Sequence, residues 1–343
     1  MDPALLSLIA KKAVSECTVE CFNLFSWGEP LLHPGIHQLI RIVQDAGIPC
    51  NLSSNLNVPI NFDAIMAANP ACFKISLSGF TQEVYGFSHR GGDIDRVKEN
   101  MIALAEAKKR NHADTHIFVT YHRYRHNLTE ESMMRRFSAA LGFDFDPIWA
   151  LMLPVEKVLN YLDGSDAEFP VTNEDHQLIH KLALPLKESL EASQQQKNQP
   201  CLLRQDQISL DHKGNVQLCC GIFDAGRFTL GNYLKMPLAE IQEVRKTHSM
   251  CKRCMHHGAH LYLTYRIPGM DNLLLGSISQ EDAKSLDLRR EFAQKQMERK
   301  LQTIYLKYFP WIITKKQKAA IKALLNHVLC LANRSKRLFS GKG

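Results

Sequence analysis

The sequence has no apolar run long enough to cross a membrane. Such a span needs roughly 18 consecutive apolar residues, and none occurs in the 343-residue chain. The first residues, MDPALLSLIAKK, carry an acid at position 2 and too short an apolar stretch for a secretory signal. With 45% hydrophobic and 22% charged residues, the balance is that of a globular protein, which we expect to be cytoplasmic.

The sequence also lacks the features of a small secreted protein, the class in which cysteines form a disulfide framework. Ten cysteines stand in a long chain without a secretory signal, where metal or redox chemistry is the better interpretation. Four of them form a pattern. Cys201 is followed by twelve residues, Gly214, four residues and Cys219, and further on Cys251 and Cys254 form a C-x2-C.

The segment DHKGNVQLCC predicts a tight turn over Asp211–Asn215 that joins two short strands. A hairpin together with a C-x2-C turn brings four thiolates to one site, which suits either zinc or an iron–sulfur cluster. Free buried cysteines are the alternative, since cysteine is common in protein cores. Cys220 adjoins Cys219, and neighbours in a strand point to opposite faces, so only one of the two is a ligand of this site.

Short β-rich apolar runs alternate with helical patterns between residues 19 and 152. This alternation predicts a parallel α/β sheet, either open or curled into a barrel. The predicted strands are Val19–Ser26, Ile48–Ser54, Phe73–Leu77, His116–Tyr121 and Phe145–Leu151. The predicted helices are Gly35–Ala46, Asp63–Ala68, Ile94–Arg110 and Thr129–Leu141.

Composition divides the chain into four parts. Residues 1–152 form the α/β part, 153–200 a linking segment that ends in SQQQKNQ, 201–266 a small cysteine-rich domain and 267–343 a basic helical extension. Residues 301–343 hold nine Lys/Arg and no acid, with apolar residues at helical spacing. That pattern fits either peripheral contact with an anionic membrane or a helix docked on the protein.

Two predicted strands end in residues suited to ligand binding. Gly28, Glu29 and Pro30 follow the first strand, and Ser54 and Asn55 close the second. Ligands bind where the carboxyl ends of parallel strands converge, a glycine permits close backbone approach, and a glutamate can hold an ammonium group. Taken alone, G-E-P is equally typical of a turn that ends a strand.

Three segments together resemble the radical S-adenosylmethionine superfamily. FSWGEPLLHPGIHQLI is similar to the family's glycine-glutamate-proline segment, and ISLSGFTQEVYGFSHRGGDIDRVKEN to its fourth strand and following helix. The C-x12-G-x4-C with its later C-x2-C resembles the auxiliary-cluster domain known as SPASM or twitch. The parts occur in the family's order over residues 1–266. They imply a partial (β/α)6 TIM-like barrel without its first unit, followed by a twitch-like domain and a helical tail.

The resemblance implies roles for residues at the strand ends. Gly28, Glu29 and Pro30 hold the amine of S-adenosyl-L-methionine, Ser54 and Asn55 line its site, Ser76 faces the ribose, and Arg90 meets the carboxylate. Ser78 stands where many members have Asp. Any role tied to that carboxylate is therefore not implied for this chain.

The resemblance also implies that Cys201, Cys219, Cys251 and Cys254 ligate an auxiliary [4Fe–4S] cluster, which relays electrons because all four of its sites are filled by protein. His260 and Thr264 occupy the spacings at which the two-cluster form has further cysteines. The one-cluster twitch form therefore fits better.

Radical chemistry in this family needs a C-x3-C-x2-C loop, whose thiolates hold a second [4Fe–4S] cluster. Cys17 and Cys21 form a C-x3-C, but the third position falls on Leu24, so we interpret them as ordinary core or surface cysteines. Either the coding sequence upstream of Met1 contains the loop, or the protein has lost the reaction.

The implied reaction is reductive cleavage of S-adenosylmethionine to a 5′-deoxyadenosyl radical, which abstracts hydrogen from a substrate at the barrel mouth. The resemblance implies a peptide, sugar or cyclitol as substrate and an electron donor such as flavodoxin or ferredoxin, and no nucleic acid is expected. The alternative is a catalytically inactive, degenerate barrel that acts as a metal-stabilised binding protein.

Overall fold

A computed structural model of the protein describes residues 1–164 and 169–297. Met1–Ala283 forms one compact unit, and Lys284 begins a second. The boundaries predicted near residues 152, 200 and 266 fall inside the first unit and stay predictions. Among the described residues, no helix is long and apolar enough to span a membrane. The basic amphipathic helix predicted within residues 301–343 lies outside the described residues.

Five parallel strands form the main sheet. They are β1 (Phe22–Asn23), β2 (Cys50–Ser54), β3 (Cys72–Leu77), β4 (His116–Arg123) and β5 (Asp144–Trp149), which lie side by side in the order of the sequence. The predicted α/β class with a parallel sheet is confirmed. β1 is shorter than the predicted Val19–Ser26, since its pairing with β2 ends at the hydrogen bond from Leu24 N to Asn51 O (2.9 Å).

Six α-helices accompany these strands. They are α1 (Pro3–Glu16), α2 (Ile36–Asp45), α3 (Phe62–Ala67), α4 (Gln82–Ser88), α5 (Ile94–Arg110) and α6 (Glu131–Ala140), with short 3-10 turns η1 (Pro30–Leu32) and η2 (Leu128–Glu130). α5 matches its predicted bounds, whereas α1 and α4 were not predicted. α1 begins well, because the Oδ1 of Asp2 accepts a hydrogen bond from Leu5 N (3.0 Å) and Pro3 stands where no N–H is needed.

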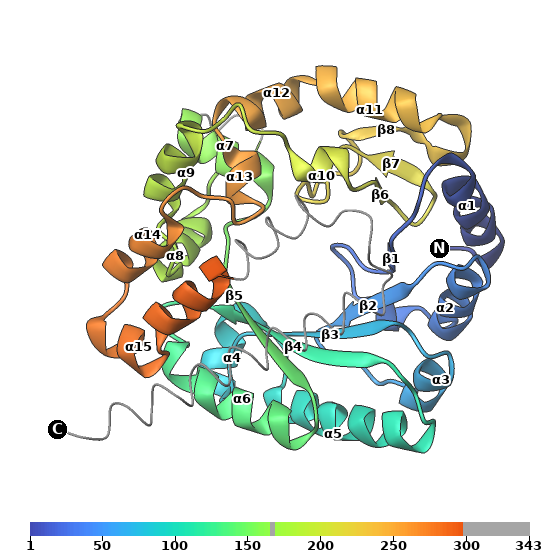
Figure 1. Cartoon of the computed structure of the whole chain (residues 1–343), viewed down its shortest axis with the longest axis horizontal. Helices are drawn as coiled ribbons and strands as arrows, with labels where there is room; N and C mark the ends of the chain where they lie inside the picture. Colours follow the sequence, from blue (N-terminus) through green and yellow to red (C-terminus); the bar gives the residue numbers. More distant parts are fainter. Residues whose placement is uncertain (165–168, 298–343) are drawn as a thin grey trace. The chain divides into compact units, whose positions relative to one another are not determined.

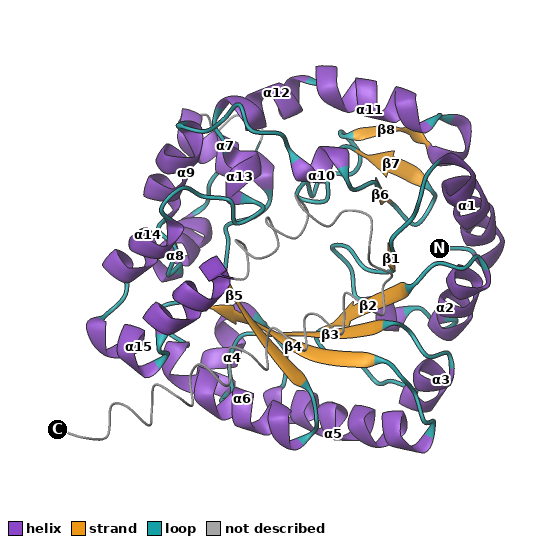
Figure 2. Cartoon of the chain, in the orientation of Figure 1, coloured by secondary structure: helices purple, strands orange, loops and turns teal. Residues whose placement is uncertain are grey.

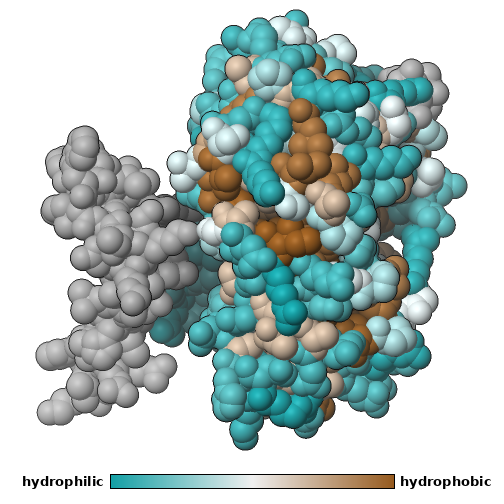
Figure 3. Space-filling view, turned by 90° about the vertical axis from the view of Figure 1, so that its right-hand side faces the viewer, coloured by the Kyte–Doolittle hydropathy of each residue, from teal (hydrophilic) through white to brown (hydrophobic). Residues whose placement is uncertain are grey.

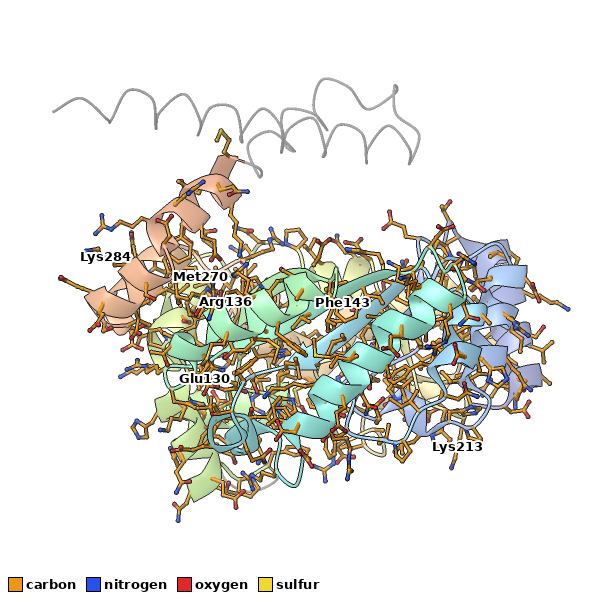
Figure 4. All side chains as sticks on the ribbon, turned by 90° about the horizontal axis from the view of Figure 1, so that it is seen from below. Glu130, Arg136, Phe143, Lys213, Met270 and Lys284 are labelled. Carbon is orange, nitrogen blue, oxygen red and sulfur yellow. The ribbon has the colours of Figure 1, made fainter. Side chains whose placement is uncertain are left out.

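The face of the sheet turned toward α3, α5 and α6 is apolar (Figures 1 and 2). Five side chains on it have 0% exposure: Leu52, Phe73, Ile75, Val119 and Tyr121. Figure 4 looks onto this layer, where α5 and α6 cross the strands. Burial of these side chains supplies the main core of the first unit.

The opposite face of the sheet, here called the inner face, is polar. Side chains alternate along a strand, so the residues between the apolar ones point to this side. They include Asn51, Ser53, Lys74, Ser76, Phe118, Thr120, His122 and Asp146. Purely parallel sheets usually carry apolar residues on both faces. A polar inner face is therefore a feature that function, and not folding, has to explain.

The chain beyond β5 adds nine described α-helices and a small antiparallel sheet. The helices are α7 (Val155–Asp163), α8 (Asn173–Lys181), α9 (Leu186–Gln194), α10 (Leu202–Gln205), α11 (Leu238–Thr247), α12 (Ser249–His256), α13 (Ala259–Tyr262), α14 (Met270–Ser277) and α15 (Gln280–Ser285). The strands are β6 (Ser209–Leu210), β7 (Asn215–Gln217) and β8 (Thr229–Asn232), with η3 (Tyr233–Lys235) after them. The turn predicted over Asp211–Asn215 joins β6 to β7.

The small sheet packs on α1. Ile9 and Ala13 of α1 share a buried cluster with Val216 of β7 and with Ile241 of α11. Gly214 has a positive φ of 77°, and a Cβ there would lie 3.3 Å from the Cδ1 of Ile9. The glycine thus serves both the turn and this close contact. In Figure 4 the neighbouring Lys213 lies beside the N-terminal helices.

Apolar side chains also reach the surface on the side of the unit formed by α1 and α2 (Figure 3). Leu8 and Val14 of α1 and Leu32 of η1 are exposed there. α1 therefore buries one of its faces and leaves part of another in solvent.

Candidate functional site

The four predicted cysteine ligands line one cavity. Cys201 precedes α10, Cys219 follows β7, and Cys251 and Cys254 lie in α12. The last two are three positions apart in a helix, so their side chains project from the same face. Leu218, Met250 and other apolar side chains complete the lining. Cysteines that are up to 53 positions apart in the sequence are thus gathered at one place.

Cys220 does not line this cavity. Its Sγ lies 3.5 Å from the Oε1 of Gln207 and is also hydrogen-bonded to the thiol of Cys219. Both cysteines follow the end of β7, so alternation along a strand does not separate them as predicted. The backbone N–H of Gly221 donates to the Sγ of Cys219 (3.4 Å). Of the two neighbouring cysteines, Cys219 is the one that lines the cavity with the other three.

The protein environment keeps these thiols protonated. Burial raises the pKa of Cys201, raises that of Cys251 to about 11, and holds that of Cys254 well above its usual range. The hydrogen bond with Cys220 and burial likewise raise the pKa of Cys219. A metal must displace these protons, because thiolates and not thiols are metal ligands.

Arg245 brings a buried positive charge to the same cavity. Only 3% of it is exposed, and it lines the cavity from α11. Its guanidinium donates to four backbone oxygens: Nε to Leu218 O (3.0 Å), Nη1 to Gln207 O (2.6 Å) and Arg204 O (3.2 Å), and Nη2 to Leu203 O (2.7 Å). No ion pair joins it to a carboxylate of the described residues. Buried charges are usually paired, so an anionic group in the cavity suits this arginine.

Four thiols are the donor set of either a zinc ion or an iron–sulfur cluster. Within residues 1–164 and 169–297, no group of three or more His, Cys, Asp or Glu side chains is placed to hold one metal ion. The buried guanidinium of Arg245 beside the four thiols suits an anionic group such as a cluster.

The loop that follows Cys219 is tied to the segment after the main sheet. Val155 N donates to Gly221 O (2.9 Å), and the buried Oε1 of Glu156 accepts from Phe223 N (2.9 Å) and Asp224 N (3.1 Å). The tip of this loop, Phe223, meets Trp27 edge to face with ring centroids 5.3 Å apart. An aromatic contact therefore joins the loop after Cys219 to the G-E-P loop.

The structure brings Glu29 and Asn55 together. The Oε2 of Glu29 accepts from Asn55 N (3.1 Å), and its Oε1 accepts from Leu31 N (3.0 Å). Pro30 begins η1, and nothing lies within 4 Å of a Cβ placed on Gly28. Each carboxylate oxygen keeps a further lone pair, so the loop is ordered and can still accept from a ligand.

Ser54, Ser76 and Arg90 do not join this group closely. Ser54 is 2% exposed, lies on the apolar face, and accepts from Leu56 N (2.9 Å). Ser76 lies on the inner face beside Thr120. Arg90 is exposed and pairs with Glu174 of α8 (3.0 Å). Ser78 is buried, and its Oγ lies 2.9 Å from the Nδ1 of His89.

Sequence reasoning missed the inner-face residues Ser53, Lys74, Thr120, His122 and Asp146. Burial lowers the pKa of Lys74, and the nearby Asp146 partly offsets this. Burial, together with the charge of Lys74, lowers the pKa of His122 to about 4, against the smaller opposing effect of its contact with Leu77 O (3.2 Å). His122 is therefore neutral at pH 7. The missed signal is the recurrence of polar residues at alternate positions within a predicted strand, such as Lys74 and Ser76.

His260 lines the cavity and occupies a spacing at which the two-cluster form has a cysteine. Its Nε2 is 2.9 Å from Gln199 O, and Thr264 donates to His260 O (2.8 Å). Both side chains thus have structural contacts at the spacings where the two-cluster form has cysteines.

No family model matches the sequence, and no curated protein matches it. Solved structures do resemble the chain, and three of them follow. Histidine-tagged anSMEcpe with bound AdoMet has a TM-score of 0.48 at 15% identity, over 84% of this chain and 90% of that chain. SuiB of Streptococcus suis, bound to S-adenosylmethionine, has a TM-score of 0.45 at 13% identity, over 74% and 60% of the two chains. TYW1 with a lysine-pyruvate adduct has a TM-score of 0.30 at 16% identity, over 43% and 50%.

Proposed function

We propose that the protein is a radical S-adenosylmethionine enzyme with an auxiliary [4Fe–4S] cluster of the twitch type. The observation that carries the proposal is the single cavity lined by Cys201, Cys219, Cys251 and Cys254. The contact between Phe223 and Trp27 supports it, because it joins the cysteine loop to the G-E-P loop. The partial (β/α)6 barrel is the proposed frame for both sites.

The auxiliary cluster would be held by those four thiolates, with Cys219 and not Cys220 as the second ligand in chain order. When bound, it supplies one-electron transfer. Arg245 would stabilise the anionic cluster and hold the backbone of two ligand-bearing segments by its four hydrogen bonds. The apolar lining would keep water away from the cluster.

S-adenosylmethionine would bind at the carboxyl ends of β1–β3. Gly28, Glu29 and Pro30 would receive its amine, with Asn55 and Ser76 beyond them. Arg90 would reach the carboxylate only by leaving Glu174, and an exposed ion pair of this kind contributes about 0–1 kcal/mol. The substrate, a peptide or a small molecule such as a sugar or cyclitol, would lie over the inner face. Flavodoxin or ferredoxin would supply electrons.

The residues present do not fit the cluster that cleaves S-adenosylmethionine. Cys17 is exposed at the end of α1, and Leu24 stands at the position of a third thiolate. The sequence contains no C-x3-C-x2-C motif, so no residue is assigned to the cleavage step.

Anaerobic reconstitution with iron and sulfide tests the proposal. We expect about four irons and four sulfides per chain, because one [4Fe–4S] cluster is bound. S-adenosylmethionine should bind in isothermal titration, and the Glu29→Gln variant should weaken that binding while keeping the iron. Binding of zinc in place of iron, or no binding of S-adenosylmethionine, would contradict the proposal.

The second candidate is a non-catalytic binding protein whose cysteine site is structural. The absence of a C-x3-C-x2-C in the sequence favours it. Four bound irons with no affinity for S-adenosylmethionine, or bound zinc, would support this candidate.

A further inference from the structure

Four polar groups of the inner face have no partner among the described residues. They are the Nζ of Lys74 and the hydroxyls of Ser53, Ser76 and Thr120, for which no hydrogen bond or ion pair to residues 1–164 or 169–297 occurs. Thr120 is the most telling, because it is 3% exposed and its Oγ1 is fully enclosed. A buried hydroxyl without a partner is costly, so such groups usually have a ligand or water.

Strand register places the four groups together. Ser53 of β2 is opposite Lys74 of β3, and Ser76 of β3 is opposite Thr120 of β4. Neighbouring strands are about 4.8 Å apart and alternate residues along a strand about 6.6 Å apart, so the four side chains stand on a patch roughly 10 Å across. The four residues belong to β2, β3 and β4, the three middle strands of the sheet (Figure 2).

All four groups can donate hydrogen bonds. Lys74 offers three N–H donors on a positive charge, and each hydroxyl offers one O–H. The Nζ of Lys74 lies 5.2 Å from the centroid of the Phe25 ring. This contact gives its N–H groups no hydrogen-bond acceptor. One cation surrounded by hydroxyl donors is the chemistry that binds an anion.

We propose that Lys74, Ser53, Ser76 and Thr120 bind an anionic group of the substrate, a carboxylate or a phosphate, with Ser76 at the border between this group and the ribose of the cofactor. Asp146 fixes the orientation, because it lies opposite Thr120 on the β5 side and accepts hydrogen bonds from hydroxyl or ammonium groups. The substrate therefore lies across the sheet with its anion toward β2 and β3. The inference rests on the proposed function, because it takes the bound anion to be part of that enzyme's substrate.

Chemical labelling of Lys74 tests this proposal without iron or turnover, so its failure is distinguishable from failure of the radical chemistry. Reductive methylation with formaldehyde is followed at Lys74 and at the exposed Lys109 by peptide mass spectrometry. Inorganic phosphate or acetate, at an ionic strength held constant with chloride, should slow labelling of Lys74 several-fold and leave Lys109 unchanged. The anion that protects at the lower concentration identifies the substrate group as phosphate or carboxylate.

Two variants test the hydroxyls. Thr120→Val keeps the shape of the side chain and should raise the half-protecting anion concentration about fivefold, the effect of losing one hydrogen bond. Ser53→Ala should act in the same direction. Equal labelling of Lys74 with and without both anions overturns the proposal. So does protection by S-adenosylmethionine alone, since the anion would then be that of the cofactor.

Discussion

Replacement of Arg245 by Met tests how the cysteine cavity is held together. The change removes a guanidinium that donates to the carbonyls of Leu203, Arg204, Gln207 and Leu218. A buried carbonyl left without its donor costs about 1–3 kcal/mol. Only the bond to Leu218 O is buried and the other three are part-buried, so the total loss is about 2–4 kcal/mol. That loss is a large fraction of the roughly 5–15 kcal/mol that stabilises a typical domain.

Urea unfolding of the iron-free protein measures this loss directly. Arg245→Lys should be intermediate, because its ammonium serves fewer carbonyls. Arg266→Met is the matched control, since Arg266 donates to Pro200 O (3.1 Å) from a more exposed place and its loss should cost under about 1 kcal/mol. An Arg245→Met protein within about 1 kcal/mol of wild type would refute the reasoning. In the reconstituted protein, a redox titration should show a more negative cluster potential for Arg245→Met than for Arg245→Lys.

Three further predictions concern the remaining polar groups. Cys254→Ser should lose the iron of the reconstituted protein while Cys220→Ser keeps it, and equal iron analyses for both would contradict the ligand assignment. The free energy of unfolding should fall by up to a few kcal/mol as pH drops from about 6.5 to about 4, because His89 and His122 have folded pKa values of about 4 and the unfolded chain takes up protons first. Denaturation at several pH values measures this, and a double His89→Asn/His122→Asn variant that keeps the same slope would exclude these histidines as the cause. Thr120→Val should raise the free energy of unfolding by about 1 kcal/mol in the same assay, since it removes an enclosed hydroxyl without a partner; a less stable protein would mean that Oγ1 has one.

The sequence was sufficient for the sheet because its signal is local. Each strand is a short run of β-forming residues, and α5 carries its own cap at Asp93. The hairpin turn before Cys219 is also a local pattern, whereas the C-x2-C, which was predicted as a turn, lies in the helix α12. The assignment of the four cysteines as ligands stays a prediction. α1 was not predicted, because its sequence was interpreted only in terms of a secretory signal. α4 is short and has no side-chain cap.

Other features depend on residues far apart in the sequence. Arg245 binds carbonyls 27 to 42 positions earlier, and Arg90 pairs with a glutamate 84 positions later. No local pattern contains such distances. Ser54 lies on the apolar face and not with the predicted ligand-binding residues. Side chains alternate along β2, so Ser53 and Asn55 point to one face and Ser54 points to the other.

The division of the sheet into an apolar and a polar face has a consequence for divergence of the protein. Stability rests on side chains such as Phe73 and Val119, and ligand contacts would rest on their neighbours Lys74 and Thr120. Because alternate positions of one strand serve separate purposes, substitutions at the polar positions can change specificity with little loss of core packing. The same backbone can therefore acquire new substrates by single substitutions, while the helix-covered positions stay under a constraint of shape.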